Sequence, residues 1–187
     1  SNKNVRSRLM GIPTLISTAT ASNDASVDIT SGIDSTYDEY MFVCTDINPA
    51  TDGQNFTVQF NAAAASGFNE TITSTFFRAY HAEDDSATAL QYEASRDQAQ
   101  GTAYQPLTST VGNGADESCA GIVHLFSPSN TTYVTHFYSR FTMNSSDSEA
   151  FDEYCAGYVN ATAAVDEISF KFASGNMDGV IQMYGIK

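Results

Sequence analysis

The side chains that most often carry out catalysis are few in this sequence, and their spacing matches no catalytic pattern. Nucleophilic catalysis requires a serine or cysteine beside a histidine that an acidic group orients. The chain has three histidines, His81, His124 and His136, and each lies in a stretch whose alternation is typical of a β-strand. No H-E-x-x-H, Walker or dinucleotide-binding motif is present. We therefore expect histidines on a sheet face, with His124 and His136 on adjacent strands, no catalytic residues and no enzymatic activity.

The chain also contains four pairs of adjacent carboxylates, which offer a second kind of chemistry. They are Asp38/Glu39, Asp84/Asp85, Asp116/Glu117 and Asp152/Glu153. Two carboxylates that face each other across a cleft can hydrolyse a glycosidic bond. Acidic residues that are adjacent in sequence are more typical of solvated loops, because charged side chains are mostly exposed. We prefer this second interpretation for all four pairs.

A cluster of oxygen-bearing side chains around residues 46–53 indicates either a cation site or a turn. Asp46, Asn48 and Asp52 are spaced as in part of an EF-hand loop, and such oxygens suit Ca²⁺. Pro49 lies inside this loop, and Ala50 occupies the position of the third ligand, so the pattern departs from an EF-hand at two places. We therefore expect a plain hairpin turn here, with no metal or other cofactor in the chain.

The three cysteines, Cys44, Cys119 and Cys155, are too few and too widely spaced for a disulfide framework or a C-x-x-C metal site. Cys44 lies in an apolar run, which predicts a small buried hydrophobic side chain. Cys119 and Cys155 share the local sequence Cys-Ala-Gly and could lie on paired strands, joined by a disulfide. We favour free thiols, because cytoplasmic assembly keeps thiols reduced.

The charge of the chain is strongly acidic and unevenly distributed. Its 187 residues include 22 acidic and 8 basic side chains, for a net charge of −14, which argues against nucleic acid as a partner. Lys3, Arg6 and Arg8 all fall within the first eight positions. Residues 1–11 are therefore predicted to be a basic arm, either solvated or anchored on an acidic neighbouring subunit. No apolar run approaches about 18 residues, so we expect a soluble protein without membrane insertion.

The remaining residues, 12–187, are expected to form one all-β domain. Stretches rich in Val, Ile, Thr, Phe and Tyr recur between turn sequences, which is typical of a sandwich or barrel. The predicted fold is an antiparallel β-sandwich, jelly-roll-like, in which the strand at 56–62 has one buried and one wet face. The predicted strands cover residues 12–19, 27–33, 37–47, 56–62, 72–82, 107–111, 120–126, 132–143, 156–160, 168–173 and 180–186.

One segment, residues 83–105, lacks this alternation and is predicted to be a long surface loop with a helical turn near residues 89–98. Tyr92 and Tyr104 lie in this segment. Because an exposed aromatic ring can stack against a sugar, these two tyrosines are the candidate residues for glycan binding.

The end of the chain is predicted to be a closing β-hairpin, with strands at 165–173 and 180–187 joined by a loop at 174–179. Ile168, Phe170 and Phe172 alternate with polar residues, as the period of a strand requires. Asp178-Gly179 supplies a turn sequence. We expect the final strand to be integral to its sheet, with Gly185 allowing a close backbone approach.

Four segments of the chain carry a resemblance to a known class of proteins. They are the ending Gly179-Val-Ile-Gln-Met-Tyr-Gly-Ile-Lys187, of the form G-x-I-x-M-Y-G-I-K, together with residues 31–42, 47–53 and 168–175. In this order they are similar to structural proteins from the virions of tailed marine bacteriophages. The resemblance implies a β-sandwich component of a virion, assembled in the host cytoplasm, and no specific activity.

Two functions fit these observations. The first is a non-enzymatic structural component of a phage virion, a capsid decoration or a head or tail fibre protein. It would form a homo-oligomer and attach to other virion proteins through Lys3, Arg6 and Arg8. The second is a lectin-like module of the tail that binds a host surface glycan through Tyr92 and Tyr104. A glycoside hydrolase ranks last, because the spacing of the carboxylates marks no acid/base pair.

Overall fold

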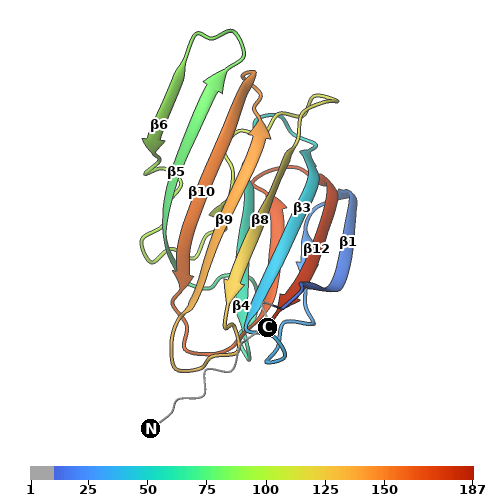
Figure 1. The fold of residues 1–187 in the computed structure, drawn as a ribbon, viewed down its shortest axis with the longest axis vertical. Helices are drawn as coiled ribbons and strands as arrows, with labels where there is room; N and C mark the ends of the chain where they lie inside the picture. Colours follow the sequence, from blue (N-terminus) through green and yellow to red (C-terminus); the bar gives the residue numbers. More distant parts are fainter. Residues whose placement is uncertain (1–10) are drawn as a thin grey trace.

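The computed structural model describes residues 11–187, and this part of the chain contains no helix. Twelve strands form two antiparallel sheets that make a β-sandwich (Figure 1). The predicted all-β sandwich is confirmed, and its jelly-roll detail stays a prediction. The strands are β1 (Thr14–Asp24), β2 (Val27–Ile29), β3 (Glu39–Pro49), β4 (Phe56–Ala62), β5 (Ile72–Ala82), β6 (Thr88–Tyr92), β7 (Gln105–Pro106), β8 (Cys119–Phe126), β9 (Thr135–Asn144), β10 (Glu149–Val159), β11 (Val165–Phe172) and β12 (Met177–Ile186).

The larger sheet has eight strands in the order β1-β12-β3-β8-β9-β10-β5-β6, and Figure 1 shows it face on. Its strands follow from alternating apolar and polar residues, which give each strand an inner and an outer face. In β9, Phe137, Phe141 and Met143 are buried, while Tyr138 and Thr142 between them are exposed. The outer face of this sheet therefore presents rows of side chains to solvent.

The smaller sheet has four strands in the order β2-β11-β4-β7. All seven residues of β4 are buried, so the predicted wet face of this strand is wrong. The physical reason is a covering loop: the side-chain amide of Gln59 donates hydrogen bonds to the carbonyl oxygens of Glu70, Thr102 and Ala103 at 3.0, 3.1 and 3.0 Å. The polar side of β4 is satisfied by protein groups instead of water.

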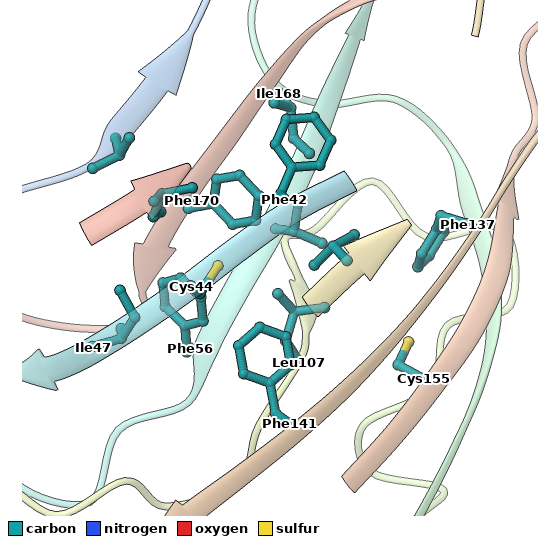
Figure 2. Packing of buried hydrophobic residues seen from close by; sticks show 14 of the residues in the cluster. Phe42, Cys44, Ile47, Phe56, Leu107, Phe137, Phe141, Cys155, Ile168 and Phe170 are labelled. Carbon is teal, nitrogen blue, oxygen red and sulfur yellow. The ribbon is translucent and has the colours of Figure 1, made fainter. Parts of the chain in front are cut away.

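The core between the two sheets is rich in phenylalanine (Figure 2). Phe56 of β4 contacts Phe141 of β9 and Phe170 of β11, with ring centroids 5.8 Å apart in both pairs. Phe170 also contacts Phe42 of β3, at 5.7 Å. Because full burial of one such side chain stabilises the fold by about 2–3 kcal/mol, these rings contribute strongly to the attachment of the smaller sheet to β3 and β9.

Two connections that the sequence predicts as hairpins cross from one sheet to the other. β3 pairs with β12 in the larger sheet, whereas β4 pairs with β11 in the smaller one. The closing hairpin of the last two strands and the hairpin turn at 48–53 are therefore wrong predictions. The two crossings lie side by side, because the Ala50 N–H donates to the Asn176 carbonyl at 2.8 Å and the Ala173 N–H to the Asn55 carbonyl at 3.0 Å. Turn residues indicate that a strand ends, but not which sheet the chain enters next.

The last strand, β12, is integral to the larger sheet, as predicted, because it pairs with β1 on one side and β3 on the other. A side chain at Gly185 would collide with the ring of Tyr37, which confirms the expected close approach. Gly179 has a φ of 133°, and a Cβ there would lie 2.7 Å from the Asp46 carbonyl oxygen. Both glycines of this strand are thus required by their surroundings.

The segment at 83–105 contains an edge strand where the sequence predicts a helical turn. β6 pairs with β5, with Tyr92 opposite Phe77 and Leu90 opposite Ala79. The helix prediction is wrong because residues 88–92 pair with the free edge of β5, and this backbone pairing outweighs the helix propensity of the stretch. Residues 107–111, predicted as a strand, form an irregular buried segment, and β10 begins at Glu149 instead of residue 156.

The basic residues of the predicted arm, Lys3, Arg6 and Arg8, lie outside the described residues. From residue 11 to the last residue, the chain contains no helix that could cross a membrane.

Candidate functional site

The outer face of the larger sheet carries aromatic, basic, acidic and hydroxyl side chains close together. In β9 the outward residues are His136, Tyr138, Arg140 and Thr142, which alternate with buried ones. Strand pairing places His124 of β8 opposite Tyr138. An aromatic ring, a guanidinium and a hydroxyl therefore lie in one row along the strand direction.

A hollow of about 500 Å³ opens over β8, β9 and β10 at this row. It lies on the outer face because its side chains come from the outward positions of these strands. Small residues at Ala120 and Thr142 leave space between the larger groups. The hollow is lined by Ala120, Gly121, Ile122, His124, Tyr138, Arg140, Thr142 and Asp152.

Two further hollows extend this first one along the sheet. One, of about 590 Å³, shares Thr142 and Asp152 with it and continues toward Leu90 of β6. The other, also about 590 Å³, lies by Phe126 and His136, at the β9 end nearer Tyr138. We call the three hollows together the outer groove. The remaining lining residues are Ala79, Tyr80, His81, Thr88, Ala89, Ala150 and Phe151 in the hollow toward β6, and Ser127, Asn130, Thr132, Tyr133, Val134 and Thr162 in the hollow by Phe126.

A stack of three rings separates the first hollow from the one by Phe126. Tyr138 stacks on His124 at 4.6 Å between centroids and on Phe126 at 5.6 Å. Glu39 of β3 hydrogen-bonds the Nδ1 of His124 and holds that ring in place. Tyr138 is 44 % exposed, and its other cross-strand neighbour, Ala156 of β10, presents only a methyl group. The tyrosine ring is thus supported on one side and accessible from solvent.

Arg140 and Asp152 form a bidentate ion pair at the edge of the first hollow. The Nε and Nη2 of Arg140 donate to the two carboxylate oxygens of Asp152 at 2.9 and 2.8 Å. These hydrogen bonds from Arg140 lower the pKa of the Asp152 carboxyl below its ordinary value. The Tyr154 hydroxyl also donates to Asp152, at 3.2 Å, and the guanidinium lies 5.1 Å from the centre of the Tyr154 ring. These four contacts orient the pair.

The two tyrosines that the sequence nominates for glycan binding lie on different sheets. Tyr92 is in β6, at the outer edge of the larger sheet, where it is 54 % exposed and its hydroxyl donates to Asp97. Tyr104 packs on the smaller sheet: its hydroxyl donates to the Ser169 Oγ at 3.0 Å, and the Lys171 ammonium lies 4.0 Å from its ring centre. The structure does not bring the two together.

The histidines lie where the sequence predicts them, on the face of the sheet. His124 and His136 are on the paired strands β8 and β9, but each faces an aromatic ring, Tyr138 and Phe126 respectively, and not the other histidine. His81, on β5, contacts the exposed Asp85 at 3.1 Å.

The cysteines are all free and buried. Cys44 is a small core side chain, as predicted. Cys119 and Cys155 are not on paired strands, because β9 lies between β8 and β10. Burial raises the pKa of both thiols well above the ordinary value, so they are poor nucleophiles.

The prediction that all the paired carboxylates are solvated loop acids is wrong for Glu39, a partly buried residue of β3, and for the pair Asp152 and Glu153. Both lie in β10, where alternation sends Asp152 outward and Glu153 into the interior with no exposed surface. The Ser109 N–H donates to Glu153 at 2.7 Å, and Arg78 and Arg96 lie close enough to favour its charge. Burial nevertheless raises the pKa of Glu153 above its usual range. Within residues 11–187, no group of three or more His, Cys, Asp or Glu side chains is arranged to hold a metal ion.

Sequence reasoning missed the outer groove, although one signal for it was present. The alternation of residues 135–144 places Tyr138 and Arg140 on one face, and both are polar or amphipathic. The neighbours that complete the site, His124 and Asp152, follow only from the order of the strands. No family model matches this chain, and no curated protein matches it either.

Proposed function

We propose that the protein is a non-enzymatic structural component of a phage virion, a homo-oligomer that attaches to other virion proteins through its basic arm. The observation that carries the proposal is where the segments resembling virion proteins lie in the fold. Residues 31–42 and 179–187 are neighbours, since Phe42 pairs with Met183 and Tyr40 with Gly185. The Asp38 N–H also donates to the Ile186 carbonyl at 3.2 Å. These two resembling segments are thus paired in the larger sheet, which supports the proposal more strongly than scattered segments would.

The distribution of charge supports attachment through the arm. All 22 acidic residues lie within residues 11–187, where they face only five basic ones. Of those five, Arg140 is paired with Asp152, and Arg78 lies 3.2 Å from Glu93. An arm that carries Lys3, Arg6 and Arg8 is therefore complementary to the body of a second copy or to another acidic subunit.

Particle incorporation tests this proposal. Removal of residues 1–9 should abolish incorporation, and replacing Lys3, Arg6 and Arg8 by glutamine should reduce it in the same direction. The control is a chain with Lys171→Gln, which also removes one positive charge but leaves the arm intact. Electron cryo-microscopy of purified particles should then place the protein on the capsid, a fibre or the tail. Full incorporation without the arm would contradict the attachment, and absence of the protein from particles would contradict the virion role.

A further inference from the structure

The outer groove has the features of a binding site for a neutral polyhydroxylated chain. Its ring stack offers an apolar surface, and its ion pair offers hydrogen-bond donors and acceptors side by side. We propose that the outer groove binds a neutral saccharide chain, with Tyr138 stacking against one sugar ring and the Arg140–Asp152 pair binding adjacent hydroxyl groups. This activity is separate from attachment through the arm, so either can fail without the other.

The ring of Tyr138 suits a sugar because one face of a pyranose consists of C–H groups. Such a face packs on an aromatic ring as another apolar surface would, while the tyrosine hydroxyl stays in water. Stacking on His124 fixes the ring before a ligand arrives, so little side-chain entropy is lost on binding. The methyl group of Ala156 leaves room beside the ring.

The ion pair suits neighbouring hydroxyl groups. Arg140 uses its Nε and one hydrogen of Nη2 on Asp152, and a guanidinium carries five N–H groups in all. The remaining N–H groups can donate to one sugar oxygen, while the carboxylate accepts from the next hydroxyl. Orientation of the pair by Tyr154 gives this recognition a fixed geometry.

The charge of the site favours a neutral ligand over an anionic one. The positive charge of Arg140 is balanced by Asp152 within the groove, and the chain as a whole carries a net charge of −14. Phosphate, sulfate or sialic acid would meet a repulsive field here. An uncharged polyol is not repelled by this field.

The length of the groove favours a chain over a single sugar. Two of its hollows share Thr142 and Asp152, and the third lies beyond the ring stack by Phe126. Volumes of about 500–590 Å³ each fall within the range of small-molecule sites. Successive sugar units can therefore occupy successive hollows.

The test is binding of the purified chain to neutral hexasaccharides of glucose, mannose and galactose, measured by calorimetry and on a glycan array that also carries sialylated and sulfated chains. At least one neutral hexasaccharide should bind, and Tyr138→Ala should weaken that binding about tenfold or more. Ala120→Tyr, which fills the first hollow without removing any contact, should do the same. The matched control is Tyr104→Ala, which removes a tyrosine from the other sheet and should change the affinity by less than about twofold.

Several results would overturn the proposal. They are binding to none of the neutral chains at about 1 mM, a preference for the anionic chains, or unchanged affinity in Ala120→Tyr. A self-associated wild type that Tyr138→Ala makes monomeric would also overturn it, since the groove would then be an interface between copies. Circular dichroism and thermal unfolding confirm that each variant is folded. Particle incorporation of Tyr138→Ala should be unchanged, which separates this proposal from the one on the arm.

Discussion

The inner face of the larger sheet is covered in two different ways, and its two halves have different interiors. Over β3 and β9 the cover is the smaller sheet, and the space is filled by rings such as Phe56 and Phe170 (Figure 2). Over β5 and β10 the cover is the segment that follows β6, which is irregular except for the two residues of β7 at the edge of the smaller sheet. There the interior contains Glu153 and Gln105, both with no exposed surface. Phe76 and Phe151 are buried there too, so we call this the polar half only for the polar groups that it encloses, and the half over β3 and β9 the apolar half.

The nature of the cover explains the difference. The backbone groups of a sheet pair with neighbouring strands, so a covering sheet presents only side chains to the core. An irregular segment has unpaired backbone groups, and buried ones need partners. The side chain of Gln105 provides such partners, because its amide donates to the carbonyl oxygens of Arg96 and Pro106 at 2.8 and 2.9 Å. Its oxygen accepts from the Ser74 hydroxyl of β5 at 2.6 Å. A loop that covers a sheet therefore needs buried polar side chains as hydrogen-bond partners for its backbone.

The largest effect is expected in the apolar half. Phe56→Ala removes the ring that contacts Phe141, Phe170 and Phe172, and the cavity should lower the free energy of unfolding by about 4 kcal/mol. Urea unfolding measures this loss. Phe56→Leu, which keeps much of the volume, should lose less than half as much. Equal losses in the two variants would show that ring packing does not hold the smaller sheet.

In the polar half, Glu153→Ala should cost about 3 kcal/mol, because it leaves the donors of Ser109 unpaired and removes a carboxylate that favours the charge of the partly buried Arg96. The same unfolding measurement applies. A matched control is Asp152→Ala on the outer side of the same strand, which should cost much less. A loss at Glu153 no greater than at Asp152 would remove the distinction between the two halves of the interior.

The stability that the polar half contributes should also depend on pH, whereas that of the apolar half should not. Burial raises the pKa of Glu153 above 4.5, so between pH 4.5 and the higher folded value the native state binds more protons than the unfolded state. Stability should therefore fall as the pH rises through this window. Glu153→Gln removes this contribution, and the wild type should lose stability relative to the variant from pH 4 upward. A constant difference between the two across this range would contradict the raised pKa.

The apolar half is the part of the fold that the sequence predicts well. Phe56 and Phe170 stand in alternating stretches, and alternation is a local property of the chain. The burial of Glu153 could not be predicted, because its neighbour Asp152 interrupts the apolar pattern of β10 and suggests a loop. The outer groove could not be predicted from the sequence for a related reason. Alternation identifies Tyr138 as an outward residue, but its neighbours on other strands depend on the strand order.

A smaller effect is expected for the loop itself. Gln105→Leu keeps the volume but removes four hydrogen bonds, one to Ser74 of β5 and three within residues 96–106, and it should cost about 2 kcal/mol. Hydrogen exchange should show local opening of this segment before β4 or β11 opens. Ser95→Ala, at an exposed position of the same segment, is the control. If Gln105→Leu opened the whole fold at once, the two halves would be one cooperative unit.

The smallest effect on stability is expected outside the sandwich, on the outer face. Arg140→Gln breaks the pair with Asp152, but the Arg140 side chain is 64 % exposed, so the urea midpoint should stay within error of the wild type. The pKa of Asp152 should instead rise toward its ordinary value, because the hydrogen bonds from Arg140 are what lower it. Carbon-detected NMR of the carboxyl group measures this shift, with Glu167 as an internal reference that the substitution leaves untouched. The pair orients its own side chains and adds little to the stability of the fold. A large drop in the urea midpoint would show instead that the outer face stabilises the fold as the interior does.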